Sequence, residues 1–438
     1  MTPDSLPPVF VLPEPGLAGL DWFQERLARA TNRGPVRVLL PEAEAGLLPS
    51  AESLDVTTFT SGNLTGARQD MAQWREYFAS AETVHLVRDL GNGWGYETFY
   101  TFLRLAGCRA FLETTHQGDQ AVEPPPLPRP GAIRSVLVTM CGGIGNVVQC
   151  TPVVAACARR GWDTAFVPVS DANGASLHNL FADNGLRGVR VLTPEQAQAE
   201  TPDLVLNLEN RAQLALGDAF LSPYRAGTDQ SEAGLYAAFM RNVTGLAADP
   251  GATWVGGLDA EVDSALLGRV VVCPGSKPGW EPKRWPRMNE LLLALSRPLV
   301  LCREQDLDIH ADCELLQPLT APNAEFALHL DLAQAAQVLR HARCVVAHDC
   351  GMAHVAAAAG APTLILFGPS SVNRNRPQRD NARALRLGLA CSPCQGRDTG
   401  PGRLAPHACS CDLDYACMAG LSVEQVLGTL RQLCPTIA

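Results

Sequence analysis

Short hydrophobic runs, separated by glycine- and proline-containing turns, recur along most of this chain. After residue 131 the runs are rich in Val, Leu, Ile and Cys, and helical stretches lie between several of them. Strands are expected at 133–138, 164–169, 204–208, 270–273, 298–302, 344–347 and 363–367, and helices from about 146 and at 288–295, 332–342 and 352–359. Strands that alternate with helices form parallel sheets covered on both faces. The pattern therefore predicts two doubly wound α/β domains, at about 131–250 and 255–430, that face each other across a cleft.

A smaller α/β pattern precedes these two blocks. The runs 36–40 and 84–87 are typical of buried strands, and 97–106 of a helix that Gly107 ends. The segment 123–131 contains five prolines, which excludes a helix or a central strand and indicates a stiff connector. The expected division is an N-terminal module at 1–122, the linker at 123–131, and Rossmann-like domains at 132–250 and 255–438.

Composition and charge exclude several classes of protein. Hydrophobic residues make up 46% of the 438 residues, which is enough for a large core. With 45 acidic and 35 basic residues the net charge is −10, which argues against a general nucleic-acid binder. No apolar run approaches the ~20 residues of a membrane helix, and the start lacks the features of a secretion signal. We therefore expect a cytoplasmic protein without a transmembrane segment, and peripheral contact with the inner membrane stays open.

Three loops, each between a strand and a helix, carry the candidate chemistry. The first contains Gly142, Gly143 and Gly145, followed by Asn146. Glycines there allow a tight turn and close approach of a ligand, and the N–H groups of a helix start favour negative charge. The spacing is not that of a dinucleotide site. The alternative is a tight turn that binds nothing.

The second loop carries a hydroxyl and three cations: Ser276, Lys277, Lys283 and Arg284. It follows a predicted strand, and open α/β folds bind ligands at the carboxyl ends of strands. Such a cluster suits a diphosphate. The alternative is a solvated basic loop.

The third loop runs from His348 to His354. Asp349 falls at the expected helix start, where it would cap the helix or bind sugar hydroxyls. The N–H groups of Cys350, Gly351 and Met352 are expected to point into the cleft. His354 would reach a phosphate or pack in the core. Glu304 and Asp306, just after another predicted strand, are candidates for contacts with the ribose of a nucleotide.

These loops resemble the motifs of glycosyltransferase family 9, the bacterial lipopolysaccharide heptosyltransferases. The resemblance lies in 143–152 (GIGNVVQCTP), 283–286 (KRWP), 349–354 (DCGMAH) and 366–369 (LFGP), and covers about 131–430. It implies a GT-B fold, with the acceptor on the N-terminal domain and a nucleotide-diphosphate sugar on the C-terminal one. It also implies an inverting transfer of a sugar such as heptose to a glycan or protein acceptor, without a catalytic metal or other cofactor.

One position departs from the family pattern. The family commonly has Asp, the base that deprotonates the acceptor, where this chain has Asn146, and an amide cannot take a proton at neutral pH. Either another carboxylate serves, with Asp171 as the first candidate, or the acceptor needs little help from a base. The remaining alternatives are a catalytically silent GT-B protein that binds sugar nucleotides or partners, and an epimerase or hydrolase on the same two-domain plan.

A cysteine-rich segment lies near the C-terminus. It contains Cys391, Cys394, Cys409, Cys411 and Cys417. Two closely spaced pairs of thiolates can complete a tetrahedral shell, which zinc and iron fit equally well. Autotransporter heptosyltransferases of the same family carry a metal-holding cysteine finger here. We expect a structural site if a metal is present, and metal-free thiols or a redox disulfide are the alternatives.

Overall fold

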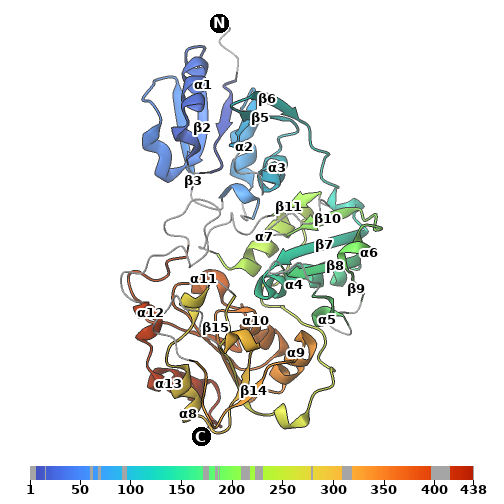
Figure 1. Ribbon diagram of the computed structural model, residues 1–438. Helices are drawn as coiled ribbons and strands as arrows, with labels where there is room; N and C mark the ends of the chain where they lie inside the picture. The colour runs from blue at the N-terminus through green and yellow to red at the C-terminus, as the bar shows by residue number, and fades with distance from the viewer. Residues whose placement is uncertain are drawn as a thin grey trace.

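The computed structural model describes residues 6–14, 16–59, 63–67, 71–90, 96–170, 177–182, 186, 188–208, 218–221, 230–277, 280–307, 318–395 and 415–437. Figure 1 shows three α/β units that follow one another along the chain, each around its own sheet. Within the described residues, no helix is both long and apolar enough to cross a membrane.

The N-terminal unit is built on a sheet of order β3-β2-β1-β4-β5-β6, parallel except for the last pair. Its strands are β1 (Val9–Val11), β2 (Val36–Pro41), β3 (Leu54–Phe59), β4 (Val84–Val87), β5 (Phe111–Thr115) and β6 (Gly118–Val122). Its helices are α1 (Asp21–Thr31), α2 (Ala72–Ala79) and α3 (Tyr96–Leu105). The predicted strands at 36–40 and 84–87 and the helix at 97–106 are confirmed. Gly107 follows the helix with φ 92°, a value that favours glycine. The sequence pattern missed β1, which has only three residues, and also β3, β5 and β6, which are largely polar or exposed.

The middle unit has an all-parallel sheet of order β11-β10-β7-β8-β9. Its strands are β7 (Ser135–Gly142), β8 (Asp163–Ser170), β9 (Val189–Val191), β10 (Leu204–Asn207) and β11 (Ala219–Phe220). Its helices are α4 (Ile144–Arg159), α5 (His178–Phe181), α6 (Pro194–Ala197) and α7 (Glu232–Thr244). Helix α4 begins at Ile144, two residues before the expected start, and contains Pro152 in its interior. Because strand order reverses on the two sides of β7, the loop after β7 lies where such sheets bind ligands.

The C-terminal unit has a second all-parallel sheet, of order β14-β13-β12-β15-β16-β17. Its strands are β12 (Val270–Cys273), β13 (Leu299–Leu301), β14 (Glu325–Ala327), β15 (Cys344–His348), β16 (Thr363–Leu366) and β17 (Ala382–Leu385). Its helices are α8 (Met288–Ala294), α9 (Leu332–Arg340), α10 (Gly351–Ala359), α11 (Val372–Asn375), α12 (Ala416–Ala419) and α13 (Val423–Leu433). Strands β12 and β15 pair directly, so the loops that follow them lie side by side.

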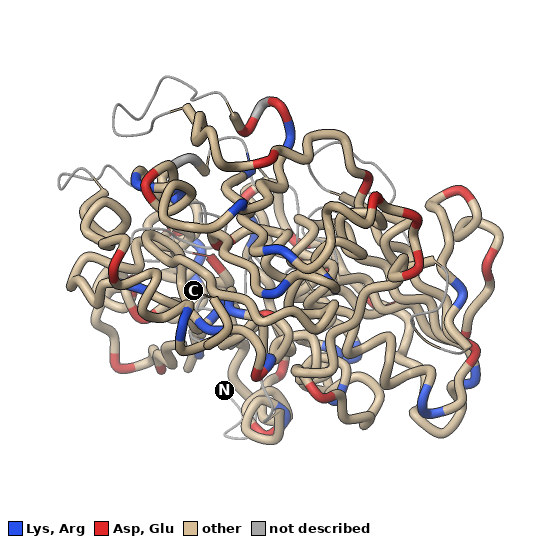
Figure 2. Tube along the Cα trace, turned by 90° about the horizontal axis from the view of Figure 1, so that it is seen from below, with Lys and Arg blue, Asp and Glu red and all other residues tan. Residues whose placement is uncertain are grey.

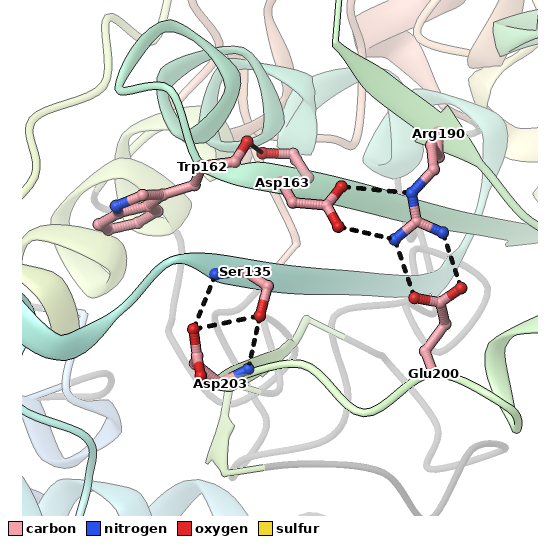
Figure 3. Close-up of polar contacts among 7 residues, drawn as sticks. Ser135, Trp162, Asp163, Arg190, Glu200 and Asp203 are labelled. Carbon is pink, nitrogen blue, oxygen red and sulfur yellow. Dashed lines mark hydrogen bonds and ion pairs between the residues drawn. The ribbon is translucent and has the colours of Figure 1, made fainter.

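The opposite end of the middle sheet is held by polar contacts (Figure 3). The guanidinium of Arg190 lies between the carboxylates of Asp163 and Glu200, with a shortest distance of 2.7 Å to Glu200. The carboxylate of Asp203 accepts hydrogen bonds from the backbone and hydroxyl of Ser135. These residues stand at the amino ends of the strands, away from the glycine loop. They stabilise the strand starts and leave the other edge for function.

Helix α7 joins the N-terminal unit to the middle one. The Asn242 side chain donates to the Gly66 carbonyl at 2.9 Å, and a Cβ on Gly66 would lie 3.6 Å from the ring of Phe239. The backbone N–H of Phe220 donates to Thr101 at 2.9 Å. Because Phe239 is fully buried by this packing, the first unit is docked on the second through apolar and polar contacts together.

The middle and C-terminal units share one hydrophobic cluster. Helix α4 packs against α10, and the cluster includes Val148 on α4 and Ala353 on α10. Arg379 donates to the carbonyls of Gly251 and Thr253 across the connection at 3.2 and 3.0 Å. The glycine loop before α4 and the loop before α10 are thereby brought face to face.

Candidate active site

The loops after β12 and β15 meet in a buried ion pair. Lys283 Nζ lies 2.8 Å from Asp349 Oδ2 and 3.2 Å from the Asp349 carbonyl oxygen. The side chains are 10% and 5% exposed. Lys283 also lies over the ring of Trp280, 4.1 Å from its centroid. The structure therefore brings together Lys283 and the start of α10, which the sequence predicted to share one site.

The carboxylate of Asp349 is held by more than Lys283. Asn375 on α11 donates to Oδ2 at 2.8 Å, and the Asn375 amide also contacts Gln395 at 3.2 Å. Burial acts to raise the pKa of Asp349, but the charge and hydrogen bond of Lys283 outweigh it and hold the pKa below its ordinary value. Asp349 is therefore ionised at neutral pH.

Of the two roles expected for Asp349, the helix cap is wrong, and the contact with sugar hydroxyls stays a prediction. The residue at the N-cap position of α10 is Cys350, and it makes no side-chain cap hydrogen bond. The Asp349 side chain is engaged by Lys283 and Asn375 instead. Asp349 precedes the N-cap position by one residue.

Arg284 organises the rest of the basic loop. Its Nε donates to Ser276 Oγ at 2.9 Å and its Nη2 to Asp306 at 3.1 Å. Arg303 also contacts Asp306, at 3.2 Å. Ser276 and Asp306 are thus buried next to one another, whereas Lys277 is exposed. Of the two carboxylates expected to contact a ribose, Asp306 lies at this loop and the Glu304 side chain is 75% exposed.

The buried His348 side chain, at the end of β15, hydrogen-bonds to two positions of the segment after β12. Its Nε2 accepts from the backbone N–H of Trp285 at 2.9 Å, and its Nδ1 donates to the Pro274 carbonyl at 2.9 Å. Burial, together with nearby Arg284, lowers the pKa of His348 to about 4. A neutral ring with the proton on Nδ1 satisfies both contacts.

The glycine loop of the middle unit touches α10. Gly142 ends β7, Gly143 is the N-cap of α4, and Gly145 is its second residue. A Cβ on Gly145 would lie 2.6 Å from the ring of His354, and one on Gly351 would lie 2.7 Å from Ile144. A side chain at either position would force a neighbour to shift, so the two loops approach each other closely.

His354 is buried at this junction. Its Nδ1 has no hydrogen-bond partner among the described residues, and burial lowers the pKa of the ring. Cys350 and Met352 are half-buried at the same helix start. Lys283 and the buried His354 nitrogen therefore lie near the N-terminus of α10, together with the backbone N–H groups of its first residues. Negative charge is favoured at such a position.

Asn146 contacts a residue that the sequence reasoning missed. Its amide Nδ2 donates to Oε1 of Glu232, the first residue of α7. Glu232 is 2% exposed and also pairs with Arg374 of α11. A glutamate at a helix start is typical of a solvated first turn, and the sequence carries no signal for a contact between positions 86 residues apart.

Several predicted residues stand elsewhere. Asp171, Cys409 and Cys411 lie outside the described residues. Cys394 Sγ contacts the Cys391 carbonyl at 3.4 Å, and Cys417 is buried at the start of α12. In the part of the chain that the structure describes, no group of three or more His, Cys, Asp or Glu residues is placed to hold a metal ion.

Comparison with known proteins gives matches to heptosyltransferases. Residues 258–402 match the family model of glycosyltransferase family 9 (heptosyltransferase). Lipooligosaccharide heptosyltransferase 2 of Haemophilus influenzae is 31% identical over 139 residues, which is 29% of this chain and 40% of that protein. Lipopolysaccharide heptosyltransferase 1 of Pseudomonas aeruginosa is 40% identical over 72 residues, 16% of this chain and 20% of that one. The chain thus matches less than half the length of these curated relatives.

Among solved structures, the dodecameric iron-containing heptosyltransferase TibC in complex with ADP-D-β-D-heptose has a TM-score of 0.51 at 14% identity, over 73% of this chain and 80% of that one. The TibC glycosyltransferase from enterotoxigenic E. coli H10407 gives 0.50 at 16% identity, over 72% and 78%. At this identity the likeness shows the fold, which is GT-B. In sequence, residues 258–402 are similar to glycosyltransferase family 9 (heptosyltransferase).

Proposed function

We propose that this protein is an inverting glycosyltransferase that moves a sugar, heptose in the first instance, from a nucleotide-diphosphate sugar to a glycan or protein acceptor. The observation that carries the proposal is the buried Lys283–Asp349 pair beside the N-terminus of α10, facing the glycine loop of the middle unit. The heptosyltransferase relatives and the bound ADP-heptose in TibC support the choice of donor.

The charges around α10 suit a departing diphosphate. Lys283 has three ammonium hydrogens and gives two to Asp349, so one remains for a phosphate oxygen. The N–H groups of Gly351 and Met352 stand at the positive end of α10. His354 Nδ1, buried without a partner in the described structure, is a further contact for an oxygen. Fixed donors of this kind stabilise the charge that develops as the sugar–phosphate bond breaks.

The proposal divides the remaining residues between donor and acceptor. Ser276, Lys277 and Asp306 would line the nucleotide side, since they follow β12 and β13. Gly142, Gly143 and Gly145 would face the acceptor. Because Lys283 and the α10 N–H groups supply the positive charge, the transfer is expected to proceed without a divalent metal.

The test is transfer by the purified chain with ADP-D-β-D-heptose and a lipopolysaccharide that lacks core heptoses. We expect ADP release that depends on the acceptor, and a gain in the mass of the acceptor. NMR should show that the anomeric configuration of the sugar is inverted, and EDTA should not lower the transfer rate. Lys283→Met should abolish ADP release. Arg190→Ala, at the other end of the middle sheet, should leave it unchanged, because Arg190 is exposed and far from the loops.

A silent sugar-nucleotide-binding protein is the alternative, and Asn146 favours it, because an amide does not take up a proton at neutral pH. The same assay separates the two functions. If thermal shift shows that the donor binds, but no ADP is released with or without an acceptor, the result supports a catalytically silent protein. Release without an acceptor supports a hydrolase.

We further propose a structural zinc or iron at the C-terminal cysteines. Cys417 Sγ would lie 3.2 Å from a Cβ on Gly368, and Ser392 of the Cys391–Cys394 turn donates to the Gly368 carbonyl. The Cys391–Cys394 turn and Cys417 therefore both lie next to Gly368. The thiols among the described residues do not by themselves form a complete set of metal ligands. Metal analysis should find one ion per chain in the wild type and much less in Cys391→Ser/Cys394→Ser. A metal-free wild type contradicts this.

We also propose a cytoplasmic location. Cys150, Cys157 and Cys344 are buried as free thiols, which suits a reducing compartment. Fractionation of cells that produce the chain should find it in the cytoplasm or loosely attached to the inner membrane, and recovery from the periplasm contradicts the proposal.

A further inference from the structure

A buried carboxylate lies against the glycine loop. Glu232 Oε1 accepts from the Asn146 amide and from the Tyr236 hydroxyl, the latter at 2.6 Å. Its Oε2 lies 3.2 Å from Nη2 of Arg374, which belongs to the C-terminal unit. Burial and the neighbouring Glu232 raise the pKa of Tyr236 well above its ordinary value, so that hydroxyl is a donor at neutral pH. Two donors from its own unit therefore fix Glu232, and the third comes from across the interface.

Transfer to a hydroxyl requires a group that receives a proton. The acceptor O–H bond breaks as the new bond to the sugar carbon forms, and the electron pair of the old sugar–oxygen bond leaves with the nucleotide diphosphate. Asn146 cannot take up the proton, because the nitrogen lone pair of an amide is delocalised into its carbonyl and the group is not basic at neutral pH. The carboxylate that the described structure holds against Asn146 is Glu232.

We propose that Glu232 receives the acceptor proton, and that Asn146 positions its carboxylate; this inference rests on the transferase function proposed above. The acceptor hydroxyl enters between the two units and replaces Arg374 at Oε2, and the proton that moves to Oε2 then passes to solvent. Oε1 stays bound to Asn146 and Tyr236 throughout. The negative charge needed by the reaction is thus carried at position 232 and not at position 146.

The pair Asn146 and Glu232 contains one amide and one carboxylate. A second carboxylate in hydrogen-bond contact with the first would repel it, so both cannot stay ionised in a buried place. Exchanging the two groups keeps one negative charge and one hydrogen bond. Asn146→Asp/Glu232→Gln is therefore a variant that moves the charge without adding to it.

The experiment measures ADP release from ADP-heptose with heptose-deficient lipopolysaccharide, and donor affinity by calorimetry, for four variants. Glu232→Gln should lower kcat by roughly a hundredfold or more, with donor affinity within about threefold of the wild type. Asn146→Asp/Glu232→Gln should recover at least about tenfold over Glu232→Gln. Asn146→Asp alone should lower kcat, and the fall of kcat on the acid side of its pH profile should begin at a higher pH. Tyr236→Phe, which keeps the charge, should stay within about tenfold of the wild type.

The double variant separates a proton acceptor from a structural role. A neutral amide at position 232 cannot form an ion pair with Arg374, so if that ion pair were all that mattered, the double variant would stay as inactive as Glu232→Gln. A double variant that binds the donor and stays inactive overturns the inference, as does a Glu232→Gln protein with wild-type kcat. If Glu232→Gln does not fold, the double variant alone decides. A wild type that binds no donor overturns the proposed transferase function instead.

Discussion

Lys283 Nζ lies 2.8 Å from Asp349 Oδ2, and the two side chains are 10% and 5% exposed, so each charge is buried only because the other is present. The two residues come from loops after β12 and β15, which are neighbours in the sheet although 66 positions separate them in the chain. The ion pair is therefore both a part of the proposed phosphate site and a requirement for the loops to fold together.

Lys283→Met should destabilise the protein by about 3–5 kcal/mol, because it leaves the Asp349 carboxylate buried and unpaired. Lys283→Met/Asp349→Asn removes that charge and should regain most of the loss. Urea unfolding followed by fluorescence measures both. If the two variants are equally unstable, the cost comes from lost packing of the lysine stem and not from the charge.

Trp285→Phe should cost about 2–4 kcal/mol with little effect on donor affinity. The Trp285 ring is 1% exposed and its Nε1 donates to the Leu421 carbonyl at 3.1 Å. The substitution leaves that carbonyl without its donor and a cavity beside it. Unfolding midpoints and donor calorimetry check the two parts. A large loss of affinity with unchanged stability would show that Trp285 touches the ligand.

Gly145→Ala should destabilise the contact between the glycine loop and α10. The new Cβ would lie 2.6 Å from the buried His354 ring, so α4 or α10 must shift, at about 1–3 kcal/mol. Gly428→Ala is the matched control: it lies in α13 with nothing within 4 Å and should stabilise by about 0.5–1 kcal/mol. Adding His354→Ala to Gly145→Ala should relieve the clash. An unchanged melting temperature in Gly145→Ala contradicts the close approach.

Acidification should destabilise the fold through His348. The pKa of His348 is lowered from 6.5 to about 4, so between these values the unfolded chain binds a proton that the folded chain does not. The free energy of unfolding therefore falls as pH drops from 6.5 toward 4, by up to about 3 kcal/mol from this residue, and its contribution is fully present above 6.5. The slope should be shallower in His348→Gln, measured by urea unfolding at several pH values. Equal slopes contradict the shift.

The central strands and the three loops after them followed from local sequence, because buried parallel strands are continuous apolar runs; the shorter or more polar strands, such as β3, β6 and β14, did not. The runs 270–273 and 344–347 are two such strands, and the pairing of β12 with β15 brings Lys283 to Asp349. The pairing itself depends on strand order, which comes from the tertiary fold. Local pattern was also too weak for β1, whose three residues follow a proline pair.

The contacts that individual side chains make could not be predicted from the sequence. Asp349 at a helix start is typical of a cap, and its ion pair depends on a lysine from another loop. Glu232 is an ordinary first-turn acid by its position, and its contact with Asn146 depends on how α7 packs against α4. Basic and acidic positions are intermixed along the trace in Figure 2, so charge pattern alone did not mark these pairs.

Helix α7 begins with Glu232 and carries Phe239 and Asn242 near its other end, against the turn around Gly66. A shortened chain that starts after the proline-rich linker would therefore expose the apolar side of this helix and remove the contacts that hold its far end. If Glu232 is the proton acceptor proposed above, such a truncation would displace its carboxylate, so the first 122 residues would support the proposed site through the packing of α7.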